Sequence, residues 1–136
     1  MMTINSVVRT AVKEFANLPL VVWCDYNSED KLIHTKDSNG FETWYDENEN
    51  KIHTKCDRFE HWYDKKGNII HTKNQYGDER WYNEDGSSYV KDASGSERWY
   101  NDKGDLIHSK FLNLEIWYDK DGNTIKIKNI DSYYEC

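Results

Sequence analysis

The sequence has few of the features that mark secreted or membrane-spanning proteins. No apolar run approaches the roughly 20 residues of a membrane-spanning helix. Arg9 and Lys13 interrupt the one apolar stretch near the N-terminus, which argues against a signal peptide. The three cysteines are odd in number and show no Cys-x-x-Cys spacing; they are Cys24, Cys56 and Cys136. We therefore expect no disulfide framework and a cytoplasmic protein.

Basic residues are a minority, because 18 Lys and Arg stand against 25 Asp and Glu, and the formal net charge is −7. Nucleic-acid binding depends on Lys and Arg that neutralise phosphates, so direct nucleic-acid binding is not expected. Only 37% of residues are hydrophobic and 32% are charged, but six Trp and ten Tyr at regular spacing argue against disorder. With 136 residues, we expect one domain over residues 1–136.

The first part of the chain follows a helical pattern. Pro19 marks a stop to that pattern. Apolar residues recur at the i, i+3, i+4 and i+7 spacing of one helix face; they are Ile4, Val7, Val8, Ala11, Val12, Phe15 and Ala16. This spacing predicts an amphipathic N-terminal helix over residues 3–18 that covers part of a sheet.

Residues 23–128 repeat with a period of 18 or 19 residues. The tryptophans of the copies are Trp23, Trp44, Trp62, Trp81, Trp99 and Trp117. The residues aligned between them are Ile33, Ile52, Ile70, Tyr89, Ile107 and Ile125. We therefore expect a mainly β fold of about six hairpin repeats, with about 12 strands in a single antiparallel meander sheet, twisted or curled. Residues 129–136 would form a C-terminal cap or tail.

The turn glycines predict a register for these hairpins. A three-residue loop with Gly in the left-handed conformation fits residues 64–67 and their counterparts, and it places Trp62 opposite Ile70. One face would then carry a core spine of alternating Ile and Trp beside a row of Glu, and the other face Tyr, His and Lys. About 12 strands at ~4.8 Å span roughly 50 Å, whereas a helix of ~13 residues is about 20 Å long. The helix is therefore too short to cover the whole spine, and curling of the sheet, a second copy of the chain or a partner protein would cover the remainder of the spine.

Rows of His and Glu are the candidates for chemistry. They are His34, His53, His71 and His108, and Glu42, Glu60, Glu79, Glu97 and Glu115. Equivalent residues of adjacent repeats lie roughly 9.5 Å apart, too far for histidines to share a metal bound at ~2 Å. The alternative metal-binding pair is His61 with either His53 or His71. A catalytic site is singular and convergent, unlike a row of equivalent glutamates. We expect no enzyme activity, no metal and no cofactor.

The repeating unit Trp-Tyr-Asp-x-x-Gly-Asn-x-Ile-His-Thr-Lys resembles known short repeats. Its Tyr-Asp-x-x-Gly-Asn segment occupies residues 63–68 and returns at residues 118–123. Over residues 23–128 the chain is similar to the YD-repeat (Rhs-type) family and its MORN-like relatives. The resemblance implies a β-hairpin array used as a scaffold or binding surface, and it carries over no catalytic residue.

We expect a non-enzymatic binding protein that occludes a protein partner, of the immunity-protein, antitoxin or phage counter-defence type. Residues 41–64 hold seven acids against three bases, which suits a partner with a basic surface. The alternative is carbohydrate or small-ligand binding through the Tyr/His face, because aromatic rows stack sugars and bases. A homodimer is a further alternative. The candidate binding residues are Tyr45, Tyr63, Tyr82, Tyr100, Tyr118, His53, His71, Glu47 and Glu49.

Overall fold

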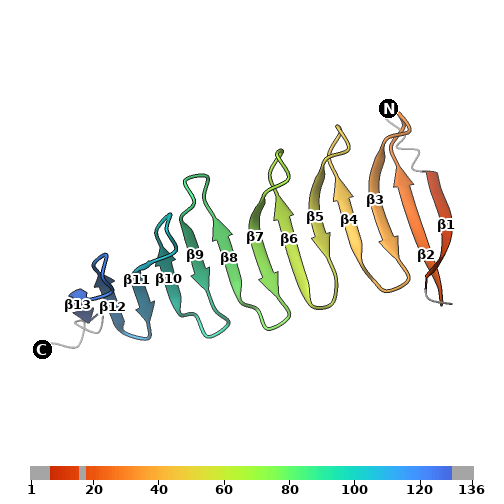
Figure 1. The fold of residues 1–136 in the computed structure, drawn as a ribbon. Helices are drawn as coiled ribbons and strands as arrows, with labels where there is room; N and C mark the ends of the chain where they lie inside the picture. Colours follow the sequence, from red (N-terminus) through yellow and green to blue (C-terminus); the bar gives the residue numbers. More distant parts are fainter. Residues whose placement is uncertain (1–6, 16–17, 130–136) are drawn as a thin grey trace, which may run out of the picture. The chain divides into compact units, whose positions relative to one another are not determined.

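A computed structural model describes residues 7–15 and 18–129, with side chains from residue 20 onward. These residues form thirteen β-strands, whose order in the sheet is their order in the sequence, an open antiparallel meander (Figure 1). The strands are β1 (Val7–Phe15), β2 (Leu18–Tyr26), β3 (Leu32–Asp37), β4 (Glu42–Tyr45), β5 (Lys51–Lys55), β6 (Phe59–Tyr63), β7 (Ile69–Asn74), β8 (Glu79–Tyr82), β9 (Ser88–Lys91), β10 (Glu97–Tyr100), β11 (Leu106–Phe111), β12 (Leu114–Tyr118) and β13 (Thr124–Asn129).

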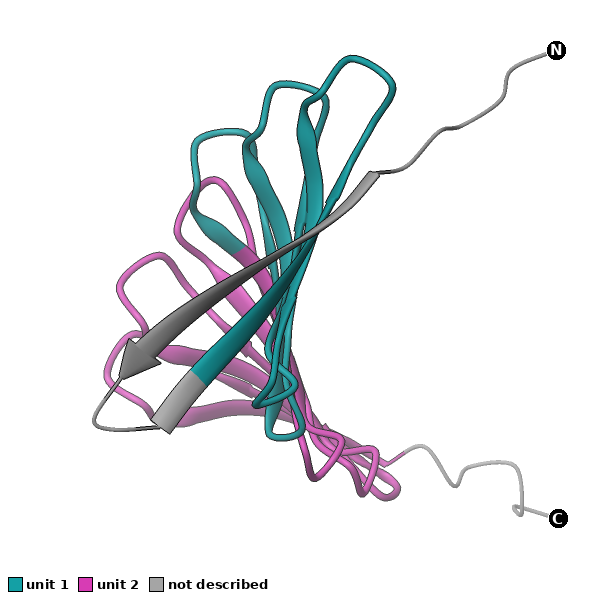
Figure 2. Cartoon of the chain, turned by 90° about the vertical axis from the view of Figure 1, so that its right-hand side faces the viewer, with its two compact units in different colours: residues 1–69 teal, residues 70–136 magenta. Residues whose placement is uncertain are grey.

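The chain divides into two compact units, residues 1–69 and 70–136 (Figure 2). The first unit contains β1–β6 and the second contains β8–β13, with β7 beginning at the boundary. Within each unit, consecutive strands pair antiparallel. The prediction of a mainly β fold with a single meander sheet is therefore confirmed.

The N-terminal helix predicted over residues 3–18 is wrong where the structure describes it. Residues 7–15 form β1, which pairs with β2 from Val7 opposite Tyr26 to Phe15 opposite Leu18; the rest of the predicted helix before β2 lies outside the described residues. The apolar spacing fits a helix, but the segment Val-Val-Arg-Thr-Ala-Val is rich in β-branched residues, which favour strands. The described residues include no helix long and apolar enough to cross a bilayer.

The turns that follow each Trp-Tyr pair use side-chain and backbone hydrogen bonds together. The Asp64 N–H donates to the Asn68 carbonyl at 2.9 Å, and the Gly67 N–H donates to the Asp64 carbonyl at 3.1 Å. Gly67 has a φ of 85°, which glycine adopts without steric cost. The Asp64 carboxylate also accepts from the Lys66 and Asn68 N–H groups, each at 2.9 Å. The predicted three-residue loop with a left-handed glycine is thus present at this turn.

A β-bulge follows most of these turns and changes the register. In the β4–β5 hairpin, Tyr45 lies opposite Lys51, but Trp44 lies opposite His53, so Ile52 is an extra residue. Because side chains alternate between faces, a shift of one residue exchanges the faces of the whole strand. The predicted pairing of Trp with Ile is therefore wrong, and Trp pairs with His. Equivalent shifts occur after the turns that precede β3, β11 and β13.

The repeat formed by β8 and β9 lacks the bulge. Here Tyr82 lies opposite Ser88 and Trp81 opposite Tyr89, with no skipped residue. Tyr89 therefore takes the place that His53 takes in its own repeat. The sequence contains a signal for this difference, because Tyr89 follows Trp81 by eight residues whereas His53 follows Trp44 by nine.

The sheet encloses no apolar core of the predicted kind. None of the hydrophobic residues among the described side chains is buried, and Ile52, Ile107 and Ile125 are 38%, 39% and 66% exposed. The Ile/Trp core spine is therefore wrong for these positions. The buried side chains that the structure describes are small and hydroxylated: Thr43, Thr54, Ser88 and Ser109. Side-chain contacts within the sheet cover three of them: Thr54 bonds to Tyr63, Ser88 to Arg80 and Ser109 to Tyr118.

Candidate functional site

One face of the first unit carries a ladder of alternating imidazole and indole rings. His34 and Trp44 stack with ring centroids 4.9 Å apart, Trp44 and His53 at 4.4 Å, and His53 and Trp62 at 4.8 Å. The interplanar angle for the last pair is 11°. Antiparallel pairing places these residues directly opposite one another, which is the position in which cross-strand aromatic pairs stabilise a sheet.

The second unit carries a ladder of the same kind. Successive centroid distances are 4.5, 5.2, 5.0, 4.2 and 4.7 Å along His71, Trp81, Tyr89, Trp99, His108 and Trp117. The Lys126 ammonium then lies 4.8 Å from the centroid of the Trp117 ring. The ladder position directly follows a bulge at His34, His53, His108 and Lys126, whereas Tyr89 reaches the same position without one.

Glutamates of the predicted row accept hydrogen bonds from the histidine rings of these ladders. The His53 ring N–H donates to Glu60 at 3.0 Å, and the His71 ring N–H donates to Glu79 at 2.8 Å. Burial alone would raise the pKa of Glu60, but the His53 hydrogen bond and nearby Lys55 outweigh it, so that pKa is lowered. These carboxylates are therefore hydrogen-bond acceptors for stacked rings.

Tyr89 reproduces the same interaction without a histidine. Its hydroxyl donates to the Glu97 carboxylate. Burial and this carboxylate raise the pKa of Tyr89 to about 12, so the phenol stays protonated at neutral pH. Among residues 7–15 and 18–129, no three His, Cys, Asp or Glu side chains are grouped closely enough to hold a metal ion.

The opposite face carries the tyrosines, which we call the tyrosine face; its tyrosines are Tyr45 and Tyr63 in the first unit and Tyr82, Tyr100 and Tyr118 in the second. Tyr63 and Thr54 share a hydrogen bond of 3.2 Å, and Tyr118 and Ser109 share one of 3.0 Å. The tyrosines thus help to bury the row of small hydroxylated residues.

The predicted Tyr/His face does not exist, because the bulge separates its two components. His53 and His71 lie in the ring ladders with Trp, on the face opposite the tyrosines. His71 lies opposite Trp81, the residue adjacent to Tyr82, and adjacent strand residues point to opposite faces. The tyrosines remain candidate binding residues, whereas His53 and His71 stack on tryptophan rings and donate to Glu60 and Glu79.

The tyrosine face also carries His61, which the sequence analysis considered only as a metal partner of His53 or His71, and Phe59, which it did not single out. His61 stacks on Phe59 at 4.4 Å, and burial, with a contribution from Lys51, lowers the pKa of His61. The signal was present in the sequence, because Phe59 and His61 alternate with Tyr63 and so share its face.

One arginine of the second unit, Arg80, lies against two of the tyrosines. The Arg80 guanidinium lies 5.2 Å from the Tyr82 ring centroid and 5.3 Å from that of Tyr100. It also donates to the Ser88 hydroxyl at 3.0 Å. This arrangement holds two tyrosine rings beside one cation, a geometry that stabilises both rings by cation–π attraction.

The two acidic candidates lie in the turn that precedes β5. Glu47 is exposed. Glu49 has a φ of 62° and takes the left-handed position that Gly67 takes in the next copy. The Glu49 carboxylate accepts from the Leu32 N–H at 3.1 Å, so it connects this turn to the first residue of β3. Glu47 is therefore the freer of the two for an intermolecular contact.

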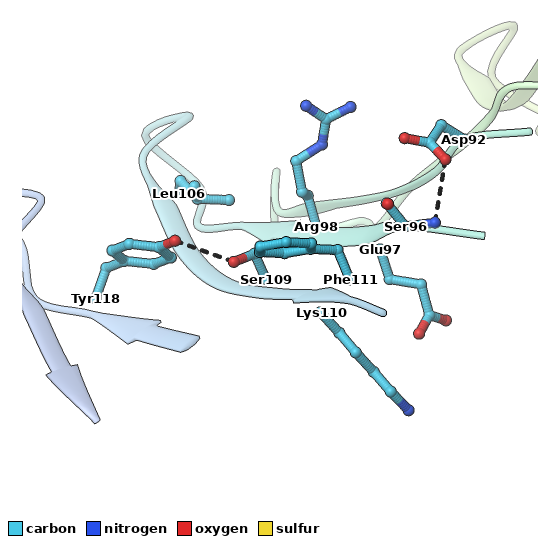
Figure 3. Close-up of a pocket in the computed structure, with 9 residues that line it drawn as sticks. All are labelled: Asp92, Ser96, Glu97, Arg98, Leu106, Ser109, Lys110, Phe111 and Tyr118. Carbon is cyan, nitrogen blue, oxygen red and sulfur yellow. Dashed lines mark hydrogen bonds between the residues drawn. The ribbon is translucent and has the colours of Figure 1, made fainter. Parts of the chain in front are cut away.

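A hollow of about 290 Å³ lies in the second unit. Its lining residues are Asp92, Ser96, Glu97, Arg98, Leu106, Ser109, Lys110, Phe111 and Tyr118. Figure 3 shows Arg98 on one side of its strand and the Glu97 and Lys110 side chains on the other. Phe111 is 40% exposed. The hollow therefore offers a phenyl ring, hydroxyl groups and a guanidinium together.

No protein-family model and no curated protein matches the sequence. The resemblance to YD-repeat and MORN-like hairpin repeats therefore stays a prediction, and the residues themselves have to support any function.

Proposed function

We propose that the protein is a non-enzymatic binding protein that occludes a protein partner, of the immunity-protein, antitoxin or phage counter-defence type. The observation that carries this proposal is the single-layer sheet, whose described hydrophobic side chains all keep some exposure to solvent. Soluble monomers rarely leave large contiguous apolar areas exposed, and such areas typically mark interaction surfaces.

The tyrosine face is the part of the sheet best suited to the partner. Tyrosine gives a large contact area at a low cost in conformational entropy and is enriched in protein interfaces. Hydrogen bonds to Thr54 and Ser109 hold the Tyr63 and Tyr118 hydroxyls in place before binding. Such preorganisation reduces the entropy that association costs.

Charge favours a partner with a basic surface. Each tyrosine directly precedes a turn, and these turns carry acidic residues such as Asp46 and Asp64. Backbone hydrogen bonds from Asn50 and Asn68 lower the pKa values of these two carboxylates, so they stay ionised at neutral pH. Aromatic contacts bordered by negative charge suit a partner with an apolar patch surrounded by Lys and Arg.

The test compares two charge reversals in the immobilised full chain. Glu47→Lys changes the turn beside the tyrosine face, and Asp57→Lys makes the same change at the opposite end of the strands; both residues are exposed. Each variant has a formal net charge of −5, that is −7 plus 2. We expect the protein captured by wild type from a bacterial lysate to be retained by Asp57→Lys and largely lost from Glu47→Lys.

Occlusion is tested with the captured protein after purification. Adding the chain in excess should block the activity of that protein, and Glu47→Lys should block it less than Asp57→Lys does. Capture of nothing above background, or equal capture by both variants, would remove the support for this function.

A second candidate function is binding of a carbohydrate or small ligand in the hollow beside Phe111 and Tyr118. The observation in its favour is a volume of about 290 Å³ lined by aromatic, hydroxyl and guanidinium groups, close to the lower end of ligand-binding cavities. Titration with glycans and nucleotides would be followed by Tyr and Trp fluorescence. Phe111→Ala should abolish a response that Phe41→Ala preserves, because Phe41 is a similarly exposed ring in the other unit, at 37% against 40%.

A further inference from the structure

The last described strand, β13, differs from the other strands that hold a ladder position. Its residues are all exposed, and Ile125 and Ile127 are 66% and 62% exposed. It pairs with β12 along one edge, and among the described residues no strand pairs with its other edge. A free strand edge presents unpaired N–H and C=O groups that can pair with another chain.

In the inner repeats, the strand equivalent to β13 has the same kinds of residue opposite it on both sides. In β5, Lys55 lies opposite Glu42 on one side and Glu60 on the other. His53 in the same strand likewise has Trp44 on one side and Trp62 on the other. Each neighbouring strand therefore presents Glu and Trp separated by one residue, running antiparallel.

The same rule holds twice in the second unit. In β9, Lys91 lies between Glu79 and Glu97, while Tyr89 lies between Trp81 and Trp99. In β11, Lys110 has Glu97 and Glu115 as its two cross-strand partners. Strands of this type are therefore completed by two Glu-x-Trp strands, one at each edge.

β13 has only half of this environment. Lys128 lies opposite Glu115, and Lys126 lies opposite Trp117. The Glu115 carboxylate lies 3.9 Å from the Lys110 ammonium, and no ion pair joins Lys128 to a described carboxylate. Lys126 covers one Trp ring and has no second ring from the described residues on its other side.

We propose that the free edge of β13 is a strand-addition site for an extended, acidic and aromatic peptide segment. The segment would run antiparallel to β13, with Glu or Asp opposite Lys128 and an aromatic residue opposite Lys126. Main-chain hydrogen bonds supply affinity in such complexes, and alternate side chains supply specificity. This site is separate from the tyrosine face and takes a partner segment of opposite charge to the one proposed there.

Charge argues against a second copy of β13 as the occupant. If two copies pair antiparallel with Ile127 opposite its counterpart, Lys126 of each copy lies opposite Lys128 of the other. Like charges directly opposite each other destabilise a strand pair, whereas an acidic segment gains from the same positions.

The probe is a synthetic peptide with the sequence of residues 113–119, Asn-Leu-Glu-Ile-Trp-Tyr-Asp, capped at both ends and labelled with fluorescein. Binding to the full chain is measured by fluorescence anisotropy. A matched peptide carrying Glu115→Lys should bind about two- to fivefold more weakly, the effect of one cross-strand charge pair.

Two variants of the protein locate the peptide. Lys128→Gln should weaken binding by the same factor, while Lys110→Gln should leave it unchanged, because Lys110 already has neighbours on both sides. Hydrogen exchange measured with and without peptide should show new protection of the amides of residues 124–129. It should show none in β4, an inner strand.

Three results would overturn the proposal. One is the absence of saturable binding up to about 1 mM peptide, a very weak affinity. Another is equal weakening by Lys128→Gln and Lys110→Gln. The third is a dimer, seen by sedimentation of the chain alone, in which the amides of β13 are already protected, because a second copy would then be the occupant.

Discussion

Removing one ring from the ladder should destabilise the protein more than removing an apolar side chain beside it. His53 stacks on Trp44 and Trp62 and donates to Glu60. Two aromatic pairs contribute about 0.5–1.5 kcal/mol each, and the hydrogen bond about 1 kcal/mol. His53→Ala should therefore lower the free energy of unfolding by about 2–4 kcal/mol.

Two matched variants make this prediction specific. His53→Tyr copies the arrangement of Tyr89, which keeps the ring stack and the bond to a glutamate, so it should cost less than about 1 kcal/mol. Ile52→Ala removes the residue that the sequence analysis assigned to the core. Because Ile52 is 38% exposed in the bulge, this change should cost only about 1 kcal/mol.

The assay has to report on the strands concerned, since repeat arrays can unfold in parts. Urea denaturation followed by Trp fluorescence gives the overall stability, and native-state hydrogen exchange of the β5 and β6 amides gives the local free energy of opening. If Ile52→Ala costs more than His53→Ala, the ladder does not stabilise the sheet, and the argument for the observed register fails.

Two further predictions concern the turns. The backbone hydrogen bond from Asn68 is the largest influence on the Asp64 carboxylate and lowers its pKa. The ionised carboxylate therefore stabilises the fold fully above its unfolded pKa of 3.8, and this stabilisation is lost as the pH falls through the lower pKa of the folded state. Asp64→Asn, which mimics the Asn101 turn, should match wild type at pH 7 and lose less stability between pH 4 and 2 in urea titrations; equal losses would contradict this. Leu112 has a φ of 50° and is 89% exposed. Because asparagine tolerates the left-handed conformation better than leucine, Leu112→Asn should raise the free energy of unfolding by about 1 kcal/mol. Asp57→Asn, in a turn where that residue has no positive φ, should not raise it, and equal effects of the two changes in calorimetry would refute the strain argument.

Local sequence rules were enough for the repeat architecture. The 18- or 19-residue period, the turn residues Asp64 and Gly67, and the alternation of residues within strands predicted an antiparallel meander. They did not predict the bulge, because turns with the same left-handed glycine are followed by a bulge before β11 and by a regular strand at β9. The eight-residue interval from Trp81 to Tyr89 was the one local sign of the difference.

The N-terminal segment was misread for a related reason. Apolar residues from Val7 to Phe15 fit one helix face, and only pairing with β2 shows that the segment is a strand. β-structure depends on partners distant in the sequence, so its propensities decide less than context does. The candidate tyrosines could be found from the repeat, but their separation from His53 and His71 could not.

The sequence by itself determined that the chain is an acidic array of short hairpins, with one ladder Trp and two turns in each copy. Those features depend on residues close together in the chain. Only the tertiary structure decided that His rather than Ile stacks between the tryptophans, and that the tyrosines lie on the face opposite His53 and His71. It also decided that Lys126 and Lys128 lie in β13, whose outer edge has no partner strand among the described residues. The physical reason is the period of two in a strand, by which one extra residue in a bulge exchanges the two faces of a strand.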